Sequence, residues 1–353
     1  MNTIVKAAVV GASGYSGEEL VRLLLGHPCV ELAAVTSRQF AGKTLAEVFP
    51  RFAHDARARR IKFVEPDAAE LASTADVVFL ALPHGVAAQF AAPLAEAGCR
   101  VIDLSADFRL KDPAVYKEFY GHDHPAPGLL AKAVYGLPEV YREQIKTARL
   151  IAAPGCYPTS VLIPTIPLLR AGLVQPTGII ASSLSGVSGA GRKTELEYLF
   201  CECNESLRPY SVPRHRHLSE LEQELGAAAG TKVGVLFVPH LVPVNRGILT
   251  TLYLRPAGRA ANTAPHDAVE QLRACYHQAY GTEPFVQLLD GSALPDTKNV
   301  VGTNYIQIAW RVDPRTGTVI VMSAIDNLVK GAAGQAVQAM NIMLGFDEQA
   351  GLK

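Results

Sequence analysis

The chain has 353 residues, of which 49% are hydrophobic and 19% are charged, a composition typical of a globular protein rather than a disordered one. This length favours two domains over a single core. Lys and Arg total 33, as do Asp and Glu, so the formal net charge is zero. Such a balance provides no broad field to hold nucleic acid or an anionic membrane, and any anion site must be local.

The six cysteines show no spacing typical of a disulfide framework. Cys201 and Cys203 are too close for an ordinary disulfide, and no second Cys pair completes a zinc site, so we expect no metal. The first residues lead directly into an apolar strand pattern, and the longest apolar runs are much shorter than a membrane span. We therefore expect a cytoplasmic protein without membrane or nucleic-acid partners.

The first predicted strand, residues 4–10, leads into a glycine-rich turn and an amphipathic helix over residues 18–25. Gly11 permits the tight turn, Gly14 lets a pyrophosphate approach backbone N–H groups, and Gly17 allows close packing of helix on strand. The GxxGxxG spacing is a weak signal alone, and a purely structural turn is the alternative. The strand–turn–helix context favours dinucleotide binding, for which we assign Gly11, Ser13, Gly14, Tyr15, Ser16 and Gly17.

The second predicted strand, residues 31–35, is followed by Thr36, Ser37 and Arg38. NAD-selective sites usually place an acidic side chain here to accept from the ribose 2′-hydroxyl. Hydroxyls and a guanidinium instead suit a 2′-phosphate. Ser37 and Arg38 therefore predict NADP(H) as the cofactor, and the alternative for Arg38 is a solvated loop charge.

Two further buried strands are predicted over residues 75–82 and 100–104. Ligands of parallel sheets sit at the carboxyl ends of the strands, so both ends should border the cofactor crevice. Pro83, at the first of these ends, is assigned to cofactor binding. Arg109 follows the second strand in the segment DLSADFR, where its planar fork could bind a phosphate or a carboxylate.

Cys156 lies in IAAPGCYPTS, between a predicted strand over residues 151–153 and a helical pattern beginning at Pro158. Pro154 and Gly155 break the strand. A cysteine at such a junction faces the helix N-terminus, whose N–H groups favour a thiolate over a thiol. A buried, inert cysteine is the alternative.

Beyond Cys156 the pattern changes to closely spaced strands, several of which alternate apolar with polar residues. This favours a largely antiparallel sheet with one covered face. The predicted strands are residues 179–184, 233–238, 247–255, 305–312 and 318–325. A last helix over residues 328–344 is expected to return to the first domain. The boundaries are therefore 1–153 with 328–353 for the first domain and 154–327 for the second.

Three polar clusters stand out in the second domain. The loop over residues 185–193 is rich in backbone donors and could close over a phosphate. In His215-Arg216-His217 a histidine could be the acid–base partner of the thiol. The segment 239–247 joins two strands and contains Arg246. Each cluster alone could be a surface feature, but together with a nucleotide turn and a poised cysteine they favour an enzyme.

The motifs GASGYSGEEL, DLSADFR, YGLPE, PGCYPT, SGVSGAGRK, HRH, PHLVPVNRG and AIDNLVKGAAGQAVQ occur in this order along nearly the whole chain. This set resembles the N-acetyl-gamma-glutamyl-phosphate reductase family of arginine biosynthesis, and more distantly the aspartate-semialdehyde and glyceraldehyde-3-phosphate dehydrogenases. The resemblance implies an α/β protein with an N-terminal Rossmann domain and an α+β catalytic domain with a mainly antiparallel sheet. It also implies NADPH-dependent reduction of N-acetyl-glutamyl 5-phosphate to the semialdehyde with release of phosphate.

By the same resemblance Cys156 is the nucleophile that forms a thioester, and His217 is the acid–base residue, with His215 the less favoured choice. The family usually follows this histidine with x-Pro-Glu, whereas here Ser219 replaces the proline. Arg109 is implied for the substrate phosphate and Arg246 for a substrate carboxylate. The remaining assignments are Ser185 and His215 to the substrate, and Ser188, Gly189 and Asn327 to the cofactor.

Three other functions keep many of these motifs. A related reductase acting on a carrier-bound aminoadipyl or glutamyl phosphate would differ only in the substrate pocket. A non-catalytic NADP-binding regulator would keep the fold without turnover. Aspartate-semialdehyde dehydrogenase is disfavoured because its usual sequence around the nucleophile differs from PGCYPT. We expect a small-molecule substrate and a homo-oligomer, dimer or tetramer, formed through the second-domain sheet.

Overall fold

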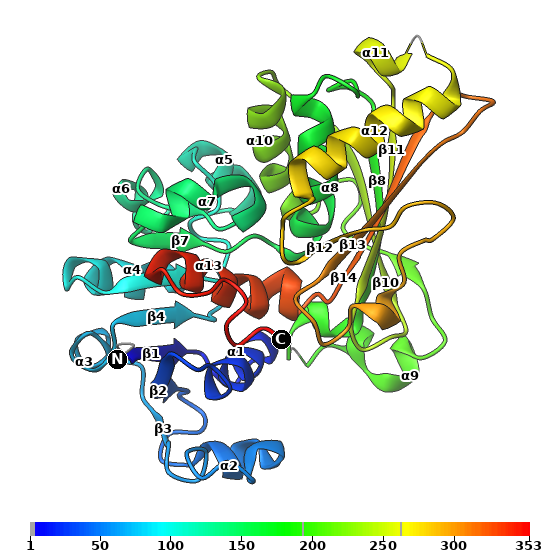
Figure 1. Ribbon diagram of the computed structural model, residues 1–353. Coiled ribbons are helices and arrows are strands. Elements are labelled where there is room, and N and C mark those ends of the chain that lie inside the picture. The colour runs from blue at the N-terminus through cyan, green and yellow to red at the C-terminus, as the bar shows by residue number, and fades with distance from the viewer. Residues whose placement is uncertain (1–3, 193, 262) are drawn as a thin grey trace. The chain divides into compact units, whose positions relative to one another are not determined.

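The structure is a computed structural model that describes residues 4–192, 194–261 and 263–353. It divides into two compact units (Figure 1). Unit 1 comprises the described residues of Met1–Pro154 together with Ala332–Lys353, and unit 2 comprises those of Gly155–Gly331. Lys193, the last residue of the predicted phosphate loop, lies outside the described residues.

Unit 1 is built on a parallel sheet with the strand order β3-β2-β1-β4-β5-β7-β6. Its strands are β1 (Val5–Val10), β2 (Val30–Thr36), β3 (Phe63–Val64), β4 (Val77–Leu80), β5 (Arg100–Asp103), β6 (Val134–Tyr135) and β7 (Leu150–Ala152). The chain runs outward from β1 to β3, then returns to the other side of β1 with β4. The strand order therefore reverses between β1 and β4, the place where doubly wound sheets bind their ligands.

The helices of unit 1 flank this sheet. They are α1 (Tyr15–Leu25), α2 (Leu45–Val48), α3 (Ala68–Thr74), α4 (Ala87–Glu96), α5 (Pro113–Tyr120), α6 (Pro127–Leu130), α7 (Pro138–Thr147) and α13 (Gly334–Leu344). The C-terminal helix α13 contacts α1 and α7. The Oδ1 atom of buried Asn341 lies 2.9 Å from Nε2 of His27, at the end of α1. The end of the chain is thereby built into the core of unit 1.

Unit 2 contains a mixed sheet with the strand order β12-β13-β14-β11-β8-β10-β9. Most neighbours are antiparallel, whereas β8 with β10 and β12 with β13 are parallel. The strands are β8 (Ile179–Gly186), β9 (Arg208–Pro209), β10 (Val235–Val242), β11 (Ile248–Leu254), β12 (Val286–Leu288), β13 (Ile306–Val312) and β14 (Val319–Ile325). The helices are α8 (Cys156–Arg170), α9 (Phe200–Cys203), α10 (His217–Ala229), α11 (Gly258–Ala261) and α12 (Pro265–Tyr280).

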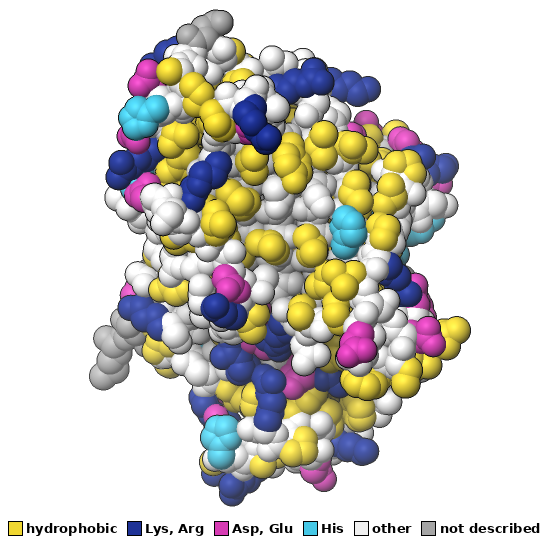
Figure 2. Space-filling view, turned by 90° about the vertical axis from the view of Figure 1, so that its right-hand side faces the viewer, with side chains coloured by type: hydrophobic (Ala, Val, Ile, Leu, Met, Phe, Trp, Pro, Cys, Tyr) yellow, Lys and Arg dark blue, Asp and Glu magenta, His cyan; other side chains and the backbone are white. Residues whose placement is uncertain are grey.

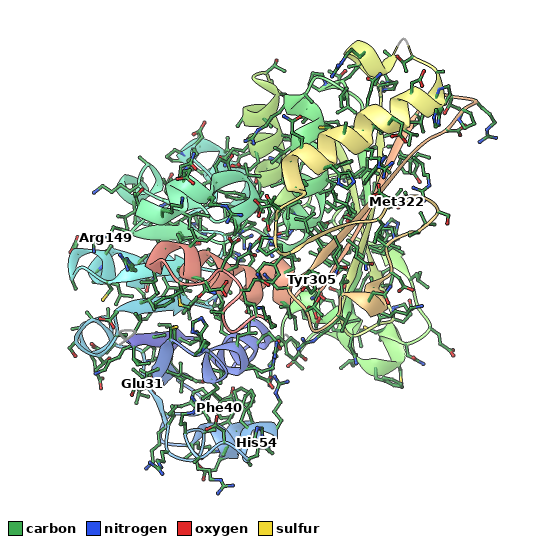
Figure 3. All side chains as sticks on the ribbon, in the orientation of Figure 1. Glu31, Phe40, His54, Arg149, Tyr305 and Met322 are labelled. Atoms are coloured by element: carbon green, nitrogen blue, oxygen red, sulfur yellow. The ribbon has the colours of Figure 1, made fainter. Side chains whose placement is uncertain are left out.

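The two faces of this sheet differ in burial. Helices α8, α10 and α12 contact the strands, and inward residues such as Ala181, Phe237 and Leu252 are buried. The opposite face carries Leu236, Ile180 and Tyr253 side by side on β10, β8 and β11, with exposed fractions of 52%, 38% and 41%. Figure 2 shows hydrophobic side chains gathered on this side, and Figure 3 places Met322 of β14 there.

Helix α8 contains two interior prolines, Pro164 and Pro167. A proline cannot donate to the carbonyl one turn earlier, so the carbonyls of Ser160 and Ile163 need other donors. Ser323 Oγ donates to the first at 2.6 Å, and the hydroxyl of Tyr280 donates to the second at 2.6 Å. These side chains from β14 and α12 keep the helix continuous and fix it to the sheet and to its neighbour.

Several element boundaries differ from those predicted, and three of them concern helices. Helix α1 begins at Tyr15 rather than at residue 18, because Gly14 is its N-cap. Helix α8 begins at Cys156 rather than Pro158, because a proline is tolerated in a first turn, where its missing N–H has no intrahelical role. The single C-terminal helix predicted over residues 328–344 is instead a π-helical turn, Val329–Ala333, followed by α13.

Candidate active site

Cys156 is the first residue of α8, and its surroundings fix the backbone on both sides. The preceding N–H, of Gly155, donates to Oε1 of Glu220 at 2.8 Å. Glu220 is buried on α10. Gly331 packs against the side chain of Cys156, because a Cβ placed on Gly331 would lie only 2.8 Å from the Cβ of Cys156. Any residue other than glycine at position 331 would therefore require its neighbours to shift. The thiol is thus held at a helix N-terminus, where the helix dipole stabilises a thiolate.

Cys156 lines a cavity of about 210 Å³ together with the predicted residues Ser185, Gly189, His215 and His217. These residues come from α8, from the end of β8 and the turn after it, and from the start of α10. A larger and more open hollow of about 900 Å³ in unit 1 contains none of the predicted site residues. The small cavity is therefore the candidate active site.

The two histidines differ in what their rings can do. Their ring centroids are 4.8 Å apart, and both rings pack edge-on against Tyr157. The backbone N–H of His217 donates to Nδ1 of His215 at 3.1 Å, which places the proton of a neutral His215 on Nε2. Burial and, second, the charge of Arg216 lower the pKa of His215 to about 4. His215 is therefore neutral near pH 7, and His217 is the better candidate for proton transfer.

A pair of tyrosines that was not predicted from the sequence forms part of the cavity wall. The hydroxyl of Tyr210 donates to that of Tyr157 at 2.9 Å, and Tyr157 donates to the backbone oxygen of His240 at 3.4 Å. Burial raises the pKa of both phenols, so both are neutral donors. The position of Tyr157 next to the cysteine in PGCYPT was the available signal, whereas nothing local indicated Tyr210.

The structure brings together the three unit 2 residues assigned to the cofactor. Asn327 accepts from the backbone N–H of Gly247 at 2.8 Å and donates to Ser188 Oγ at 3.0 Å. A Cβ on Gly189 would lie 3.8 Å from the Asn327 amide nitrogen and 3.2 Å from Ser185 Oγ. One buried amide therefore ties the loop after β8 to the turn before β11.

The two arginines assigned to the substrate each contact polar groups of their own unit. A guanidinium nitrogen of Arg246 is 3.6 Å from a carboxylate oxygen of fully buried Asp326, and Arg246 is not among the described residues that line the cavity. Arg109 is a buried residue of unit 1, and it donates to the backbone oxygens of Ala153 at 2.8 Å and Leu104 at 2.9 Å. Those two bonds join the ends of β7 and β5, so Arg109 has a structural role besides any contact with substrate.

The glycine turn of unit 1 is closely packed at two of its glycines. Gly11 has φ +79°, and a Cβ there would overlap the backbone oxygen of Ala81. A Cβ on Gly17 would lie 2.5 Å from the Gly11 oxygen. Gly14 is the N-cap of α1, whose first residues are Tyr15 and Ser16, so the turn leads directly into the N-terminus of this helix.

The adjoining strand ends surround this turn. The hydroxyls of Ser13 and Ser37 are 3.1 Å apart, and Arg38 is exposed on the loop that follows β2. Pro83 is exposed just after β4, on the far side of the point where the strand order reverses. Asp107, which the sequence analysis did not assign, accepts from Gly85 N at 2.6 Å and Ala88 N at 3.1 Å. It fixes the turn that contains Pro83.

Comparison with known proteins agrees with this geometry. Residues 6–148 match the semialdehyde dehydrogenase NAD binding domain, and residues 156–327 match the semialdehyde dehydrogenase dimerisation domain. An N-acetyl-gamma-glutamyl-phosphate reductase of Akkermansia muciniphila is 56% identical over 99% of this chain and 98% of its own. The relative of the same name from Desulfotalea psychrophila is 51% identical over the same shares. The chain belongs to the N-acetyl-gamma-glutamyl-phosphate reductase family.

Solved structures of two aspartate semialdehyde dehydrogenases share the fold of this chain. Aspartate semialdehyde dehydrogenase II of Vibrio cholerae superposes with a TM-score of 0.73 at 19% identity, covering 97% of this chain and 99% of that one. The aspartate semialdehyde dehydrogenase of Candida albicans, solved with NADP, gives 0.71 at 19% identity with the same coverage. The family resemblance and the fold class predicted from the sequence are confirmed.

The described residues contain neither a metal-ligand cluster nor a helix that could span a membrane. No group of three or more His, Cys, Asp or Glu side chains within residues 4–192, 194–261 and 263–353 is placed to hold a metal ion. Over the same ranges, no helix has the length and apolar character needed to cross a membrane.

Proposed function

We propose that this reductase-family protein carries out the NADPH-dependent reduction of N-acetyl-L-glutamyl 5-phosphate to N-acetyl-L-glutamate 5-semialdehyde, with release of phosphate, in arginine biosynthesis. The observation that carries this proposal is a cysteine at the first residue of α8, in one cavity with His217. Relatives that bear the reductase name over nearly the whole chain support it. We also propose a cytoplasmic location, where a reducing environment keeps a thiol nucleophile reduced.

The side chains of unit 2 suit acyl transfer to sulfur. The Cys156 thiolate attacks the carbonyl carbon of the acyl phosphate, the C–O bond to phosphate breaks, and a thioester remains on the enzyme. NADPH, when bound, supplies the hydride that reduces this activated acyl group. The carbon–sulfur bond then breaks, which frees the semialdehyde and returns the Cys156 thiolate, while His217 moves a proton to or from the substrate oxygen. Neutral His215 holds the His217 backbone in place.

We propose two sets of residues for the cofactor. In unit 1, the turn from Gly11 to Gly17 would hold the pyrophosphate, with Pro83 beside it, and Ser37 and Arg38 would bind the 2′-phosphate. In unit 2, Ser188, Gly189 and Asn327 form the second set. The close packing at Gly11 and Gly17 and the serine pair between β1 and β2 support this assignment.

Arg38→Asp is expected to shift coenzyme preference from NADP toward NAD. The change removes a cationic partner of the 2′-phosphate and supplies an acceptor for a ribose hydroxyl. The loop itself should keep its fold, because Phe40 packs on Phe63 with ring centroids 6.1 Å apart (Figure 3). The measurement is the ratio of kcat/KM for NADP to that for NAD. An unchanged ratio would show that Arg38 is only a solvated loop residue.

We further propose that the protein is a homo-oligomer formed through the face of the unit 2 sheet that carries Leu236, Ile180 and Tyr253. The match of this unit to a dimerisation domain supports the proposal. Large apolar side chains in adjacent register make a contiguous patch, and such patches usually mark interaction sites.

Leu236→Asp is therefore expected to shift the protein toward the monomer. Burying an unpaired carboxylate in an apolar interface is unfavourable by roughly several kcal/mol of association free energy. A loss of this size is comparable to the loss of a residue that dominates an interface. Mass would be measured by sedimentation across a range of protein concentrations. Ile4→Asp, at an exposed apolar position of unit 1, is the matched control. Equal behaviour of both variants and the parent would show that the face is not the interface.

The function is tested by supplying N-acetylglutamate semialdehyde, phosphate and NADP, and following NADPH formation, because the reverse reaction avoids the unstable acyl phosphate. Phosphate-dependent NADPH formation supports the proposal. Turnover only with a carrier-bound aminoadipyl or glutamyl semialdehyde would instead indicate the related lysine-type reductase. NADPH binding without turnover of any of these substrates would indicate a regulator.

A further inference from the structure

Charged side chains of both signs line the Cys156 cavity. Of the described residues that line it, those with charged side chains are Glu197, Arg208 and Arg216. Arg208 donates to the backbone oxygen of Glu197 at 2.8 Å, and the same nitrogen lies 3.2 Å from a Glu197 carboxylate oxygen. Arg208 therefore already contacts a carboxylate, and Arg216 is the other cationic side chain of the described lining.

Arg216 is positioned by the same backbone that positions the two histidines. It is the N-cap residue of α10, between His215 and His217. Its charge contributes to the lowered pKa of His215, after burial, and it also acts on the phenol of Tyr210. Arg216 is exposed, and it lines the cavity together with His215 and Tyr210.

The proposed substrate carries two anionic ends. Its acyl phosphate reacts at Cys156, and its α-carboxylate lies about 5 Å along the carbon chain from the reacting carbonyl. A cavity of about 210 Å³ that both Cys156 and Arg216 line places both groups within reach of one small molecule. Arg246, the arginine assigned to this carboxylate from the sequence, is instead beside Asp326.

We propose that Arg216, rather than Arg246, binds the α-carboxylate of the substrate and sets the preference of the site for substrates that carry one. The proposal rests on the proposed function, since it assumes N-acetylglutamate semialdehyde as the reaction partner. The guanidinium suits this role because its fork matches a carboxylate in two parallel hydrogen bonds.

The test compares two aldehydes that differ only in the carboxylate: N-acetylglutamate semialdehyde and 4-acetamidobutanal. Arg216→Gln is expected to lower kcat/KM for the first by about 10- to 100-fold, mainly through KM, because a hydrogen bond to a charged group is lost. The same variant should change kcat/KM for 4-acetamidobutanal by less than about threefold, because no carboxylate is present to lose its partner. Arg216→Lys should retain part of the preference.

Matched variants make the result specific. Arg214→Gln removes an exposed charge two positions away that does not line the cavity, and it should behave as the parent with both aldehydes. NADPH binding and the thermal unfolding midpoint of each variant identify any loss of folding. If Arg216→Gln unfolds, the comparison of Arg216→Lys with the parent on the two aldehydes decides.

Equal losses with both aldehydes in the Arg216 variants would overturn the proposal. So would a carboxylate-selective loss produced by Arg246→Gln or Arg208→Gln in place of Arg216→Gln. A parent enzyme that oxidises neither aldehyde would instead contradict the proposed function. A parent active on N-acetylglutamate semialdehyde with unselective Arg216 variants would contradict only this inference.

Discussion

Replacing Cys156 with Ser is expected to lower kcat by about 10³-fold or more, because a serine hydroxyl at this position cannot replace the thiolate as a nucleophile. The side chain is nearly the same size, so the close packing of Gly331 on this residue should be preserved. NADPH affinity should stay close to that of the parent, since the thiol does not hold the dinucleotide. Steady-state rates and NADPH fluorescence titration measure the two quantities.

Cys201→Ser is the matched control, because Cys201 is an exposed thiol on α9 that lies outside the cavity. It should keep full activity and remain sensitive to inactivation by iodoacetamide. Activity of Cys156→Ser within about tenfold of the parent would contradict the thioester mechanism.

His217→Asn is expected to lower kcat by about 10²- to 10⁴-fold if His217 moves the proton at the substrate oxygen. Asparagine keeps a polar side chain at the start of α10 but cannot exchange a proton near neutral pH. The limb of the pH–rate profile nearest neutrality should therefore flatten, while NADPH affinity changes little. Rates measured between about pH 5 and 9 test both statements.

His215→Asn provides the contrast. The pKa of His215, lowered to about 4, leaves it uncharged over that pH range, so its loss should not remove a titrating limb. A smaller loss of rate should follow from the lost hydrogen bond to the His217 backbone. If His215→Asn is the more damaging change, the roles are reversed. If neither histidine matters, His240, whose backbone oxygen accepts from Tyr157, becomes the next candidate.

Short-range sequence patterns were sufficient to predict the parts of the site in which functional residues and turn-forming residues are neighbours in the chain. The glycine turn of Gly11 to Gly17 and the break at Pro154 and Gly155 are short-range features, so their strand–turn–helix contexts were predicted. The exact helix starts were less accessible. Pro158 suggested the beginning of α8, but the first turn tolerates proline, and the true start places Cys156 inside the helix.

Long-range contacts were not accessible from one sequence. Glu220 accepts from Gly155, and Asn327 bonds Ser188, across 65 and 139 positions respectively. No local pattern marks these partners, because each depends on how strands and helices pack. The assignments of Arg109 and Arg246 to the substrate came from the family resemblance, whereas the structure shows that Arg109 contacts backbone oxygens and Arg246 a buried carboxylate.

The interior prolines of α8 affect the order in which parts of the chain can fold during synthesis. The carbonyls of Ser160 and Ile163 receive their donors from residues 163 and 117 positions later. During synthesis from the N-terminus, the helix emerges long before Tyr280 and Ser323 exist. Until then, two of its carbonyls have only water as a partner, so the helix cannot be buried without cost. The helix that begins at Cys156 therefore completes its hydrogen bonds only after α12 and β14 have formed.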